Sequence, residues 1–262
     1  MINTAKERML NGKQALGIEV GLGSAFAAEL LAPLNYDYVL VDNQHGKWDE
    51  TDTFNAFRSI ALGSNIPIAR VQQNDFGAIG RLLDIGALGI VVPMVNNVKQ
   101  AEDAVKATRY PPIGSRSGGA FGVNYHGYED YMASANDEIL LAIQIETAEG
   151  FENREAIMST EGIDACWIGP HDLAFSMSLT FGEKAHTEAI SSIIETCKKT
   201  NKISGISTGS PEVAQPWLDK GCQFVTVAGD AGLLVSAAEE NCLLYTSPSP
   251  RDGLLSPMPS SA

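Results

Sequence analysis

Cysteine and histidine are scarce in this sequence of 262 residues, which contains four of each. No two of the cysteines form a CxxC pair, so neither a structural zinc site nor a disulfide framework is indicated, and we expect buried small residues at Cys166, Cys197, Cys222 and Cys242. No apolar run approaches the roughly 20 residues of a membrane span. The N-terminus also lacks the basic stretch, apolar core and cleavage site of a secretory signal. We therefore expect a cytoplasmic protein that is not embedded in a membrane.

Positive charge is scarce as well. The chain has 18 Lys and Arg residues against 32 Asp and Glu residues, which gives a formal net charge of −14. Nucleic acids and anionic membranes bind proteins through positive patches that displace counterions. We therefore expect no nucleic-acid or membrane partner, and we interpret most of the acidic residues as a solvated surface.

Apolar runs rich in β-branched residues are abundant, and helical stretches separate them. Eight such runs occupy residues 16–20, 38–41, 66–69, 89–92, 139–145, 165–168, 203–206 and 224–227. Continuous rather than alternating runs are typical of strands that are buried on both faces of a parallel sheet. Because a chain of about 250 residues can form one barrel, the pattern predicts an α/β fold of the (β/α)₈ TIM-barrel type.

The segments between these runs have apolar residues at helical spacing, and each is expected to pack one apolar stripe onto the barrel. The stripes are Phe26, Leu30 and Leu31; Phe54, Phe57 and Ile60; Ile79, Leu82 and Leu83; and Val98, Ala101 and Val105. Residues 110–137 are longer and richer in Gly, Pro and aromatic residues. We expect them to form an extended loop with a short helix, and loops of this length often cover sites.

The character of the chain changes near residue 241. We assign residues 1–241 to the barrel domain and residues 242–262 to a non-native or disordered tail. The tail is rich in Ser and Pro, and proline cannot continue a helix. It also resembles a translated sequencing adaptor, so we expect the natural chain to have continued into a complete final helix.

Barrel enzymes build their sites at the carboxyl ends of the strands, and polar residues follow four of the predicted strands. Two of them are carboxylates on separate strands, Glu146 and Asp172, which a barrel can bring together. Carboxylate oxygens suit Mg²⁺, Mn²⁺ or Co²⁺, whereas the sequence has no His/Cys cluster for zinc. Spacing alone leaves open that both are surface carboxylates or helix caps.

Two basic side chains occupy other strand ends. Arg70 ends the third run and points either into the barrel mouth, where a guanidinium can stabilise an oxyanion, or out to solvent. His45 follows Asp42 by three residues, a spacing that lets the carboxylate orient the imidazole as a proton shuttle. A purely structural histidine is the alternative. Recurrence of such groups at four strand ends favours a site.

The turn Gly169–Pro170, before His171, leads toward a helix. Backbone N–H groups at the start of a helix favour an anion such as the carboxylate of a 2-oxo acid. A plain turn remains the alternative.

Together these residues resemble the HpcH/HpaI family of class II pyruvate aldolases over about Leu16 to Glu240. The similarity rests on Asp42-Asn-Gln-His45, Arg70, Leu82-Leu-Asp84-Ile-Gly86, Val92-Pro-Met94-Val, Ala107-Thr-Arg-Tyr-Pro-Pro112, Gln144-Ile-Glu146-Thr and Ile168-Gly-Pro-His-Asp172-Leu. The resemblance implies a metal-dependent aldolase that reversibly cleaves a 4-hydroxy-2-oxo acid to pyruvate, or hydroxypyruvate, and an aldehyde. It also implies a homo-oligomer, a hexamer whose subunits exchange C-terminal helices.

The resemblance further implies a role for each site residue. Glu146 and Asp172 would hold the divalent metal, while Gln144 and the turn Gly169–His171 would contact the 2-oxo acid. Arg70 would stabilise the enolate, and His45 beside Asp42 would move the proton. Asp84 would support the basicity of His45, from a neighbouring subunit in one arrangement.

Two departures from the family pattern put the substrate in doubt. Gln44 stands where many members have an acid, and His171 stands where many have a small residue. An oxaloacetate-type decarboxylase or a citramalyl-type lyase would use the same enolate site, and a non-catalytic truncated barrel is an alternative of another class. A Schiff-base mechanism has no evident nucleophile, because no lysine lies at these strand ends.

Overall fold

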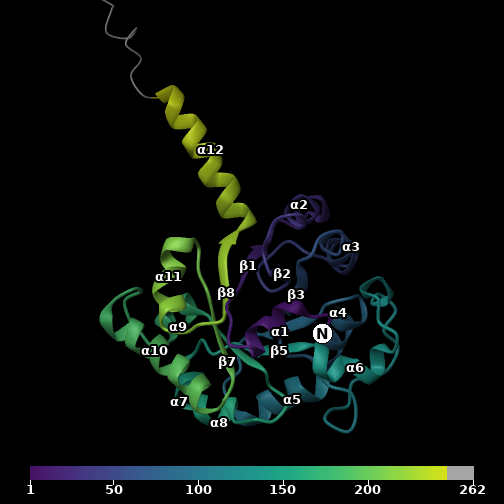
Figure 1. Cartoon of the computed structure of the whole chain (residues 1–262). Helices are drawn as coiled ribbons and strands as arrows, with labels where there is room; N and C mark the ends of the chain where they lie inside the picture. The colour runs from purple at the N-terminus through teal and green to yellow at the C-terminus, as the bar shows by residue number, and fades with distance from the viewer. Residues whose placement is uncertain (247–262) are drawn as a thin grey trace, which may run out of the picture.

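Eight parallel strands close into a barrel in the computed structural model of this chain, which describes residues 1–246 (Figure 1). The strands follow one another around the barrel in chain order, and the last pairs with the first. They are β1 (Ala15–Val20), β2 (Tyr38–Asp42), β3 (Ile66–Arg70), β4 (Gly89–Val92), β5 (Leu140–Ile143), β6 (Ala165–Ile168), β7 (Ile203–Ser207) and β8 (Phe224–Gly229). Each overlaps one predicted run, so the predicted (β/α)₈ barrel is confirmed.

Helical elements accompany the strands, and most of them surround the barrel on its outer side (Figure 1). They are α1 (Thr4–Leu10), α2 (Ala25–Leu31), α3 (Glu50–Ile60), α4 (Phe76–Asp84), α5 (Val98–Thr108), the 3₁₀ turn η1 (Asn124–His126), α6 (Tyr131–Glu138), α7 (Ala148–Glu152), α8 (Arg154–Met158), α9 (Pro170–Ser176), α10 (Lys184–Lys199), α11 (Pro211–Asp219) and α12 (Asp230–Thr246). Most begin at a polar cap; Ser24, for example, accepts a hydrogen bond from the N–H of Ala27. Such caps satisfy free N–H groups in the first turn.

Alternation along the strands decides which side chains enter the barrel, because successive residues of a strand point to opposite faces. Tyr38 and Leu40 of β2 belong to the buried cluster inside the barrel, whereas Val39 and Val41 belong to the cluster beneath the helices. Gly17 of β1 leaves the space that the Tyr38 ring fills, since a Cβ there would collide with the ring. The same period carries Glu19, Asp42 and Arg70 to the inside at the carboxyl end.

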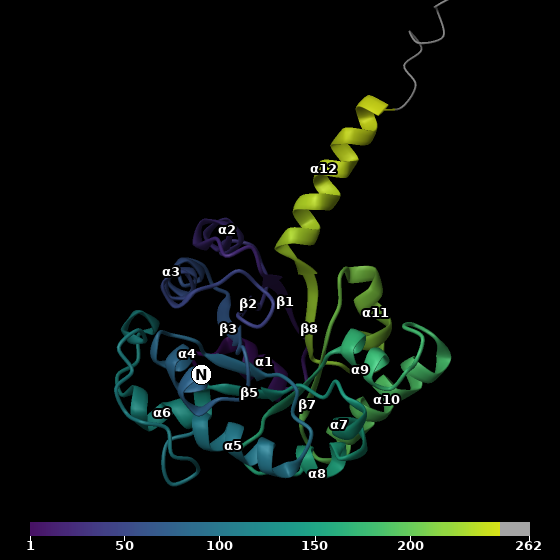
Figure 2. The same cartoon turned by 180° about the vertical axis from the view of Figure 1, so that it is seen from behind.

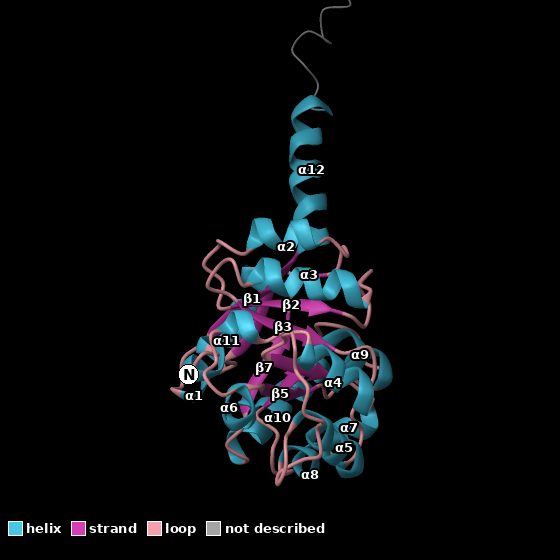
Figure 3. Ribbon diagram, turned by 90° about the vertical axis from the view of Figure 1, so that its right-hand side faces the viewer, coloured by secondary structure: helices cyan, strands magenta, loops and turns pink. Residues whose placement is uncertain are grey.

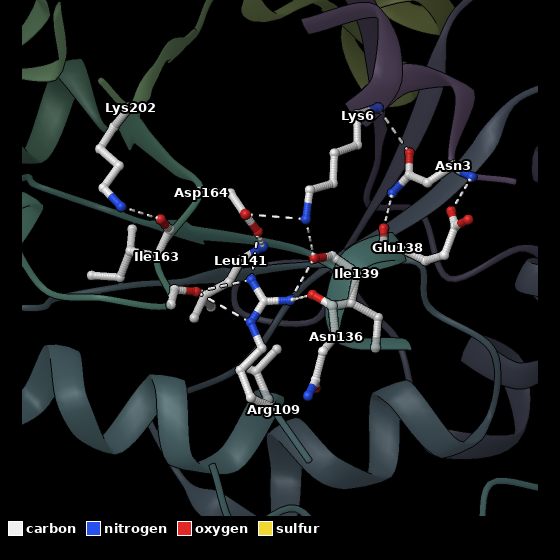
Figure 4. Close-up of polar contacts among 12 residues, drawn as sticks. Asn3, Lys6, Arg109, Asn136, Glu138, Ile139, Leu141, Ile163, Asp164 and Lys202 are labelled. Atoms are coloured by element: carbon white, nitrogen blue, oxygen red, sulfur yellow. Dashed lines mark hydrogen bonds and ion pairs between the residues drawn. The ribbon is translucent and has the colours of Figure 1, made fainter. Parts of the chain in front are cut away.

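The amino end of the barrel is closed by α1 and a polar network (Figure 4). Lys6 Nζ lies 3.0 Å from Asp164, and Arg109 Nη2 donates to the same carboxylate at 2.6 Å. Arg109 also donates to the carbonyl of Ile139 at 2.8 Å, and Glu138 accepts the backbone N–H of Asn3 at 2.8 Å. This network ties together segments that are far apart in the sequence.

Most of the predicted helix faces are buried, but that of α2 is not. Phe57, Ile60, Ile79 and Leu83 are fully buried, as expected. On α2, by contrast, Phe26 and Leu30 are 66% and 61% exposed, whereas Ala28 is buried. The reason is that Phe26 and Leu30, four residues apart, share a face opposite Ala28, and Ala28 is the residue that belongs to the buried cluster beneath the helices. The expectation that the stripe Phe26, Leu30 and Leu31 packs inward was therefore wrong for its first two members.

The last helix, α12, projects away from the barrel instead of packing against it (Figure 1, Figure 2 and Figure 3). It continues past the predicted boundary at residue 241 to Thr246. Residues 241–246 contain neither Gly nor Pro, the two residues that most disfavour a helix. The rest of the predicted tail lies outside the described residues.

The segment after α5 forms a loop with η1 and α6, as predicted, but it does not cover the mouth of its own barrel. Helix α5 runs back from the carboxyl end of β4, so the segment that connects it to β5 lies at the amino end. Cys166, Cys197 and Cys222 are buried as expected, whereas Cys242 is exposed. In the described part of the chain, no helix combines the length and apolar character needed to cross a bilayer.

Candidate active site at the carboxyl end of the barrel

Glu146 and Asp172, the two acids after neighbouring strands β5 and β6, meet at the carboxyl end of the barrel. Glu146 is only 1% exposed, and its carboxyl group lies within hydrogen-bonding reach of Asp172. The pKa of Glu146 is raised to about 7, chiefly by burial and also by Asp172, while the Met94 N–H and Arg70 partly oppose the shift. The structure thus places both predicted metal ligands at one point, near Arg70.

The position of Glu146 is fixed by its neighbours. The backbone N–H of Met94 donates to Oε1 at 2.8 Å, and Met94 holds a left-handed backbone with φ 57°, which is uncommon for residues other than glycine. Gln144 donates from Nε2 to Oε2 at 2.6 Å. Gly169 leaves room for this pair, because a Cβ there would collide with Oε2.

Arg70 is held inside the mouth by Asp42, which is its neighbour in the β2–β3 register. The guanidinium donates twice, from Nε at 2.7 Å and from Nη2 at 2.6 Å, and it lies over the Trp167 ring at 5.3 Å. Arg70 is 7% exposed. Its Nη1 makes no hydrogen bond within the described residues, so it is available to a ligand oxygen.

Asp42 does not orient His45, contrary to the prediction from their spacing. Its oxygens accept from Arg70 and from the N–H of Gln44, at 3.0 Å. A bidentate guanidinium occupies both oxygens, so the carboxylate positions Arg70 instead. His45 is exposed in a turn at the mouth that is held by backbone bonds, including Gly46 N–H to the Asp42 carbonyl at 3.0 Å.

Asp84 lies at the opposite end of the barrel from this cluster. It is the last residue of α4, before β4 begins, and its carboxylate accepts from Arg116 Nη2 at 2.8 Å. Within one chain it therefore does not reach His45. A role at a neighbouring subunit's site stays a prediction.

The turn after β6 places its residues at the mouth. Pro170 opens α9, and its carbonyl accepts from His186 Nε2 at 2.8 Å. His171 is stacked on Phe181, with ring centroids 4.2 Å apart and planes at 15°. The role of this turn in binding a carboxylate also remains a prediction.

Glu19 of β1 is a further acid at the mouth, and it is not among the site residues expected from the sequence. It lines a cavity of about 290 Å³, together with His171, Ser207, Thr208 and Thr226. Burial raises the pKa of Glu19 to about 7; Arg70 opposes this shift, and Asp42 and Asp230 add to it. The signal was present, because Ala15, Gly17 and Glu19 share the period of two that points into the barrel.

The donor atoms at this end fit a hard divalent cation. No group of three or more His, Cys, Asp or Glu side chains suited to a metal occurs among the described residues. Glu146 and Asp172 nevertheless face each other, and the nearby amide oxygen of Gln144 is buried with no hydrogen-bond partner in the described structure. Two carboxylates with the remaining positions open to water and substrate are an arrangement that Mg²⁺ accepts.

A closed parallel barrel whose carboxyl end gathers facing acids and a buried guanidinium defines the class of (β/α)₈ barrel enzymes. Residues 20–237 match the family model described as HpcH/HpaI aldolase/citrate lyase. The chain therefore belongs to this family, whose class II aldolases generally depend on a divalent metal.

Curated relatives and a solved structure agree with this assignment. The chain is 36% identical over 245 residues to a 4-hydroxy-2-oxo-heptane-1,7-dioate aldolase from Shigella boydii, covering 91% of this chain and 93% of the relative. It is 35% identical over 249 residues to a hydroxypyruvate/pyruvate aldolase from Paraburkholderia phytofirmans, covering 93% of both. A crystal structure of a family protein from Burkholderia cenocepacia matches with a TM-score of 0.88 and 28% identity, covering 94% of this chain and 100% of that one. The chain is therefore an aldehyde-lyase, and the non-catalytic barrel is not supported.

Proposed function

We propose that this chain reversibly cleaves a 4-hydroxy-2-oxo acid to pyruvate, or hydroxypyruvate, and an aldehyde, with a divalent cation held by Glu146 and Asp172. The observation that carries the proposal is the meeting of these two acids, with Arg70 nearby, at one mouth of the barrel. The names of the curated relatives support the same chemistry.

The cation would be held by Glu146 and Asp172, with Gln144 beside them. When bound, it supplies Lewis-acid polarisation of the 2-oxo acid. Mg²⁺, Mn²⁺ and Co²⁺ all suit the oxygen donors. The turn at Gly169–His171 would orient the substrate's carboxylate.

Arg70 would stabilise the charge that develops during cleavage. When the C3–C4 bond breaks, its electron pair moves to form the C2–C3 double bond, and negative charge gathers on the C2 oxygen. Arg70 Nη1, which has no other partner among the described residues, can donate to this oxygen. Because Asp42 already fixes the guanidinium, little reorganisation is needed as the charge appears.

His45 would move the proton. In the cleavage direction it takes the proton of the C4 hydroxyl, so that C4 leaves as an aldehyde carbonyl. The same proton then returns to C3 of the enolate and gives pyruvate. His45 is exposed, in the turn that follows Asp42 at the mouth of the barrel.

A chelation experiment tests the metal requirement. The purified chain is stripped with a chelator and assayed for pyruvate release from a 4-hydroxy-2-oxo acid, before and after addition of Mg²⁺, Mn²⁺ or Co²⁺. We expect activity to disappear and then return, and Glu146→Gln to prevent the return. Glu149→Gln, at an exposed carboxylate of α7, is the matched control. Full activity after exhaustive chelation would contradict the proposal.

We also propose that the chain assembles with copies of itself. Phe26 and Leu30 on α2 are exposed, and so are Leu233, Leu234 and Val235 on the projecting α12. Apolar groups gathered on a protein surface mark an interaction site, and the family resemblance points to a hexamer. Sedimentation velocity tests this: we expect an oligomer that Leu234→Glu dissociates, and a monomer at all concentrations would overturn it.

A further inference from the structure

Glu19 is an acid inside the barrel mouth that the proposed chemistry does not use. It lies on β1, whereas Arg70 is on β3 and the paired acids follow β5 and β6. The cavity that Glu19 lines is bounded by the ends of β7 and β8 and by His171. The mouth therefore has two sides. The side at β3 to β6, called here the donor side, holds the residues proposed to act on pyruvate. The side at β7, β8 and β1, called the free side, has no role in that chemistry.

The free side has room for the aldehyde. Bond formation requires the aldehyde carbon to lie against the donor carbon, and the cavity of 290 Å³ reaches the donor side at two points. Glu19 lies 3.9 Å from Arg70 Nη2, and His171 directly precedes Asp172 in the chain. The remaining lining is made of small or hydroxyl-bearing residues, with Ser207, Thr208 and Thr226 among them.

Glu19 differs from Asp42 and Asp230 because its carboxylate has no hydrogen-bond donor within the described residues. Asp42 is occupied by Arg70, and Asp230 accepts the N–H groups of Gly21 and Leu22 at 2.9 and 3.1 Å. The carboxylate of Glu19 accepts no hydrogen bond within the described residues, and its only ion pair there is the long one to Arg70. Its side chain is 26% exposed, so a ligand in the cavity can reach it.

We propose that Glu19 selects the aldehyde partner, favouring aldehydes that carry a hydroxyl group and rejecting those that carry a carboxylate. A hydroxyl group can donate to the open carboxylate, whereas a second anion would meet a like charge in a partly buried site. This inference rests on the proposed aldolase function. It sets the chain apart from a relative whose name specifies a 1,7-dioate, a substrate with a carboxylate at each end.

A comparison of two acceptor aldehydes tests the inference. The full chain with Mn²⁺ and pyruvate is given glycolaldehyde or succinate semialdehyde at pH 8, where Glu19 is ionised, and kcat/KM is measured for each. We expect wild type to prefer glycolaldehyde. Glu19→Gln should lower the glycolaldehyde-to-semialdehyde ratio by about tenfold or more, since a like charge across a binding site opposes association strongly. Most of that change should appear as a lower KM for the semialdehyde.

Two control variants test whether a change in the glycolaldehyde-to-semialdehyde ratio comes from the charge of Glu19. Glu19→Asp keeps the charge and should keep the preference, whereas Glu161→Gln removes an exposed carboxylate elsewhere and should leave the ratio at the wild-type value. Equal ratios in wild type and Glu19→Gln would overturn the inference, and so would a wild type that prefers the semialdehyde.

Enolate formation from pyruvate is measured separately. This measurement distinguishes a failure of the aldolase proposal from a failure of the proposal about Glu19. Exchange of the pyruvate methyl protons in D₂O, followed by NMR, requires the metal and enolate formation but no aldehyde. Absence of metal-dependent exchange in wild type overturns the aldolase proposal itself. Exchange in wild type and in Glu19→Gln shows that both are folded and active, and an unchanged acceptor ratio then counts against Glu19 alone.

Discussion

Both ends of this barrel bury charged side chains, but only the amino end pairs them fully. There, Asp164 is bound by Lys6 and Arg109, and Glu138 is bound by backbone N–H groups. At the carboxyl end, Glu146 faces another acid, and Glu19 has no close donor among the described residues. The amino end therefore serves the fold, whereas the carboxyl end leaves Glu19 and the Glu146–Asp172 pair without a close cationic partner among the described residues.

The pKa shifts show the same difference. Burial raises the pKa values of Glu19 and Glu146 to about 7, and Arg70 only partly opposes either shift. At the amino end, burial lowers the pKa of Lys6, but Asp164 opposes that shift directly through charge and a hydrogen bond. Strongly shifted groups in a concave site are typical of function.

Breaking the amino-end network should have the largest effect. Asp164→Ala leaves Lys6 and Arg109 buried without their carboxylate, and removal of one partner of a buried pair lowers the free energy of unfolding by about 3–5 kcal/mol. Urea unfolding measures the loss. Asp103→Ala, which removes an exposed pair with Lys99, is the control and should lose less than about 0.5 kcal/mol. Equal losses would show that the amino end is no more dependent on its pairs than the surface.

Arg70→Ala should act on turnover. Loss of a single oxyanion donor lowers kcat on the order of 10²-fold, which corresponds to about 2.7 kcal/mol. Because the change also leaves Asp42 buried alone, the double variant Arg70→Ala with Asp42→Ala separates catalysis from stability. Steady-state pyruvate release and thermal unfolding are measured on both. Turnover close to wild type would mean that the guanidinium does not contact the reacting oxygen.

Glu19→Gln should stabilise the chain at high pH. The pKa of Glu19 is raised from 4.5 to about 7, so the folded state holds this proton more tightly and loses stability as pH rises between those values. The glutamine does not titrate. Its advantage should be near zero at pH 4.5 and reach about 2 kcal/mol at pH 8, after a discount for partial exposure. Urea unfolding at both pH values measures it, and a constant difference would contradict the shift.

Gly169→Ala should have the smallest effect. The added Cβ would collide with Glu146 Oε2 and displace a proposed ligand, and such disturbances weaken metal affinity by about tenfold or more. Calorimetric titration with Mn²⁺ measures it. Gly80→Ala, where a Cβ meets nothing within 4 Å, should bind the ion as wild type does. Unchanged affinity in Gly169→Ala would argue against Glu146 as a ligand.

The sequence predicted the strands better than it predicted the contacts between them. Continuous apolar runs mark buried parallel strands regardless of their neighbours, so all eight were found. The pairing of Asp42 with Arg70 depends on the register between β2 and β3, whereas the sequence suggested a local partner for Asp42, His45. Glu19 was hidden because its strand was read as one apolar run and not by its alternation. The outward face of α2 could not be foreseen, because an apolar stripe does not show which covering element is present.

Asp230 joins two parts of the molecule that otherwise have separate tasks. It is the first residue of α12, and its carboxylate ties down the N–H groups of Gly21 and Leu22, directly after the strand that carries Glu19. Through this one side chain, the start of α12 is joined to the end of β1, beside the cavity that Glu19 lines. In the proposed oligomer, this link would connect the contact between subunits to the proposed selection of the aldehyde.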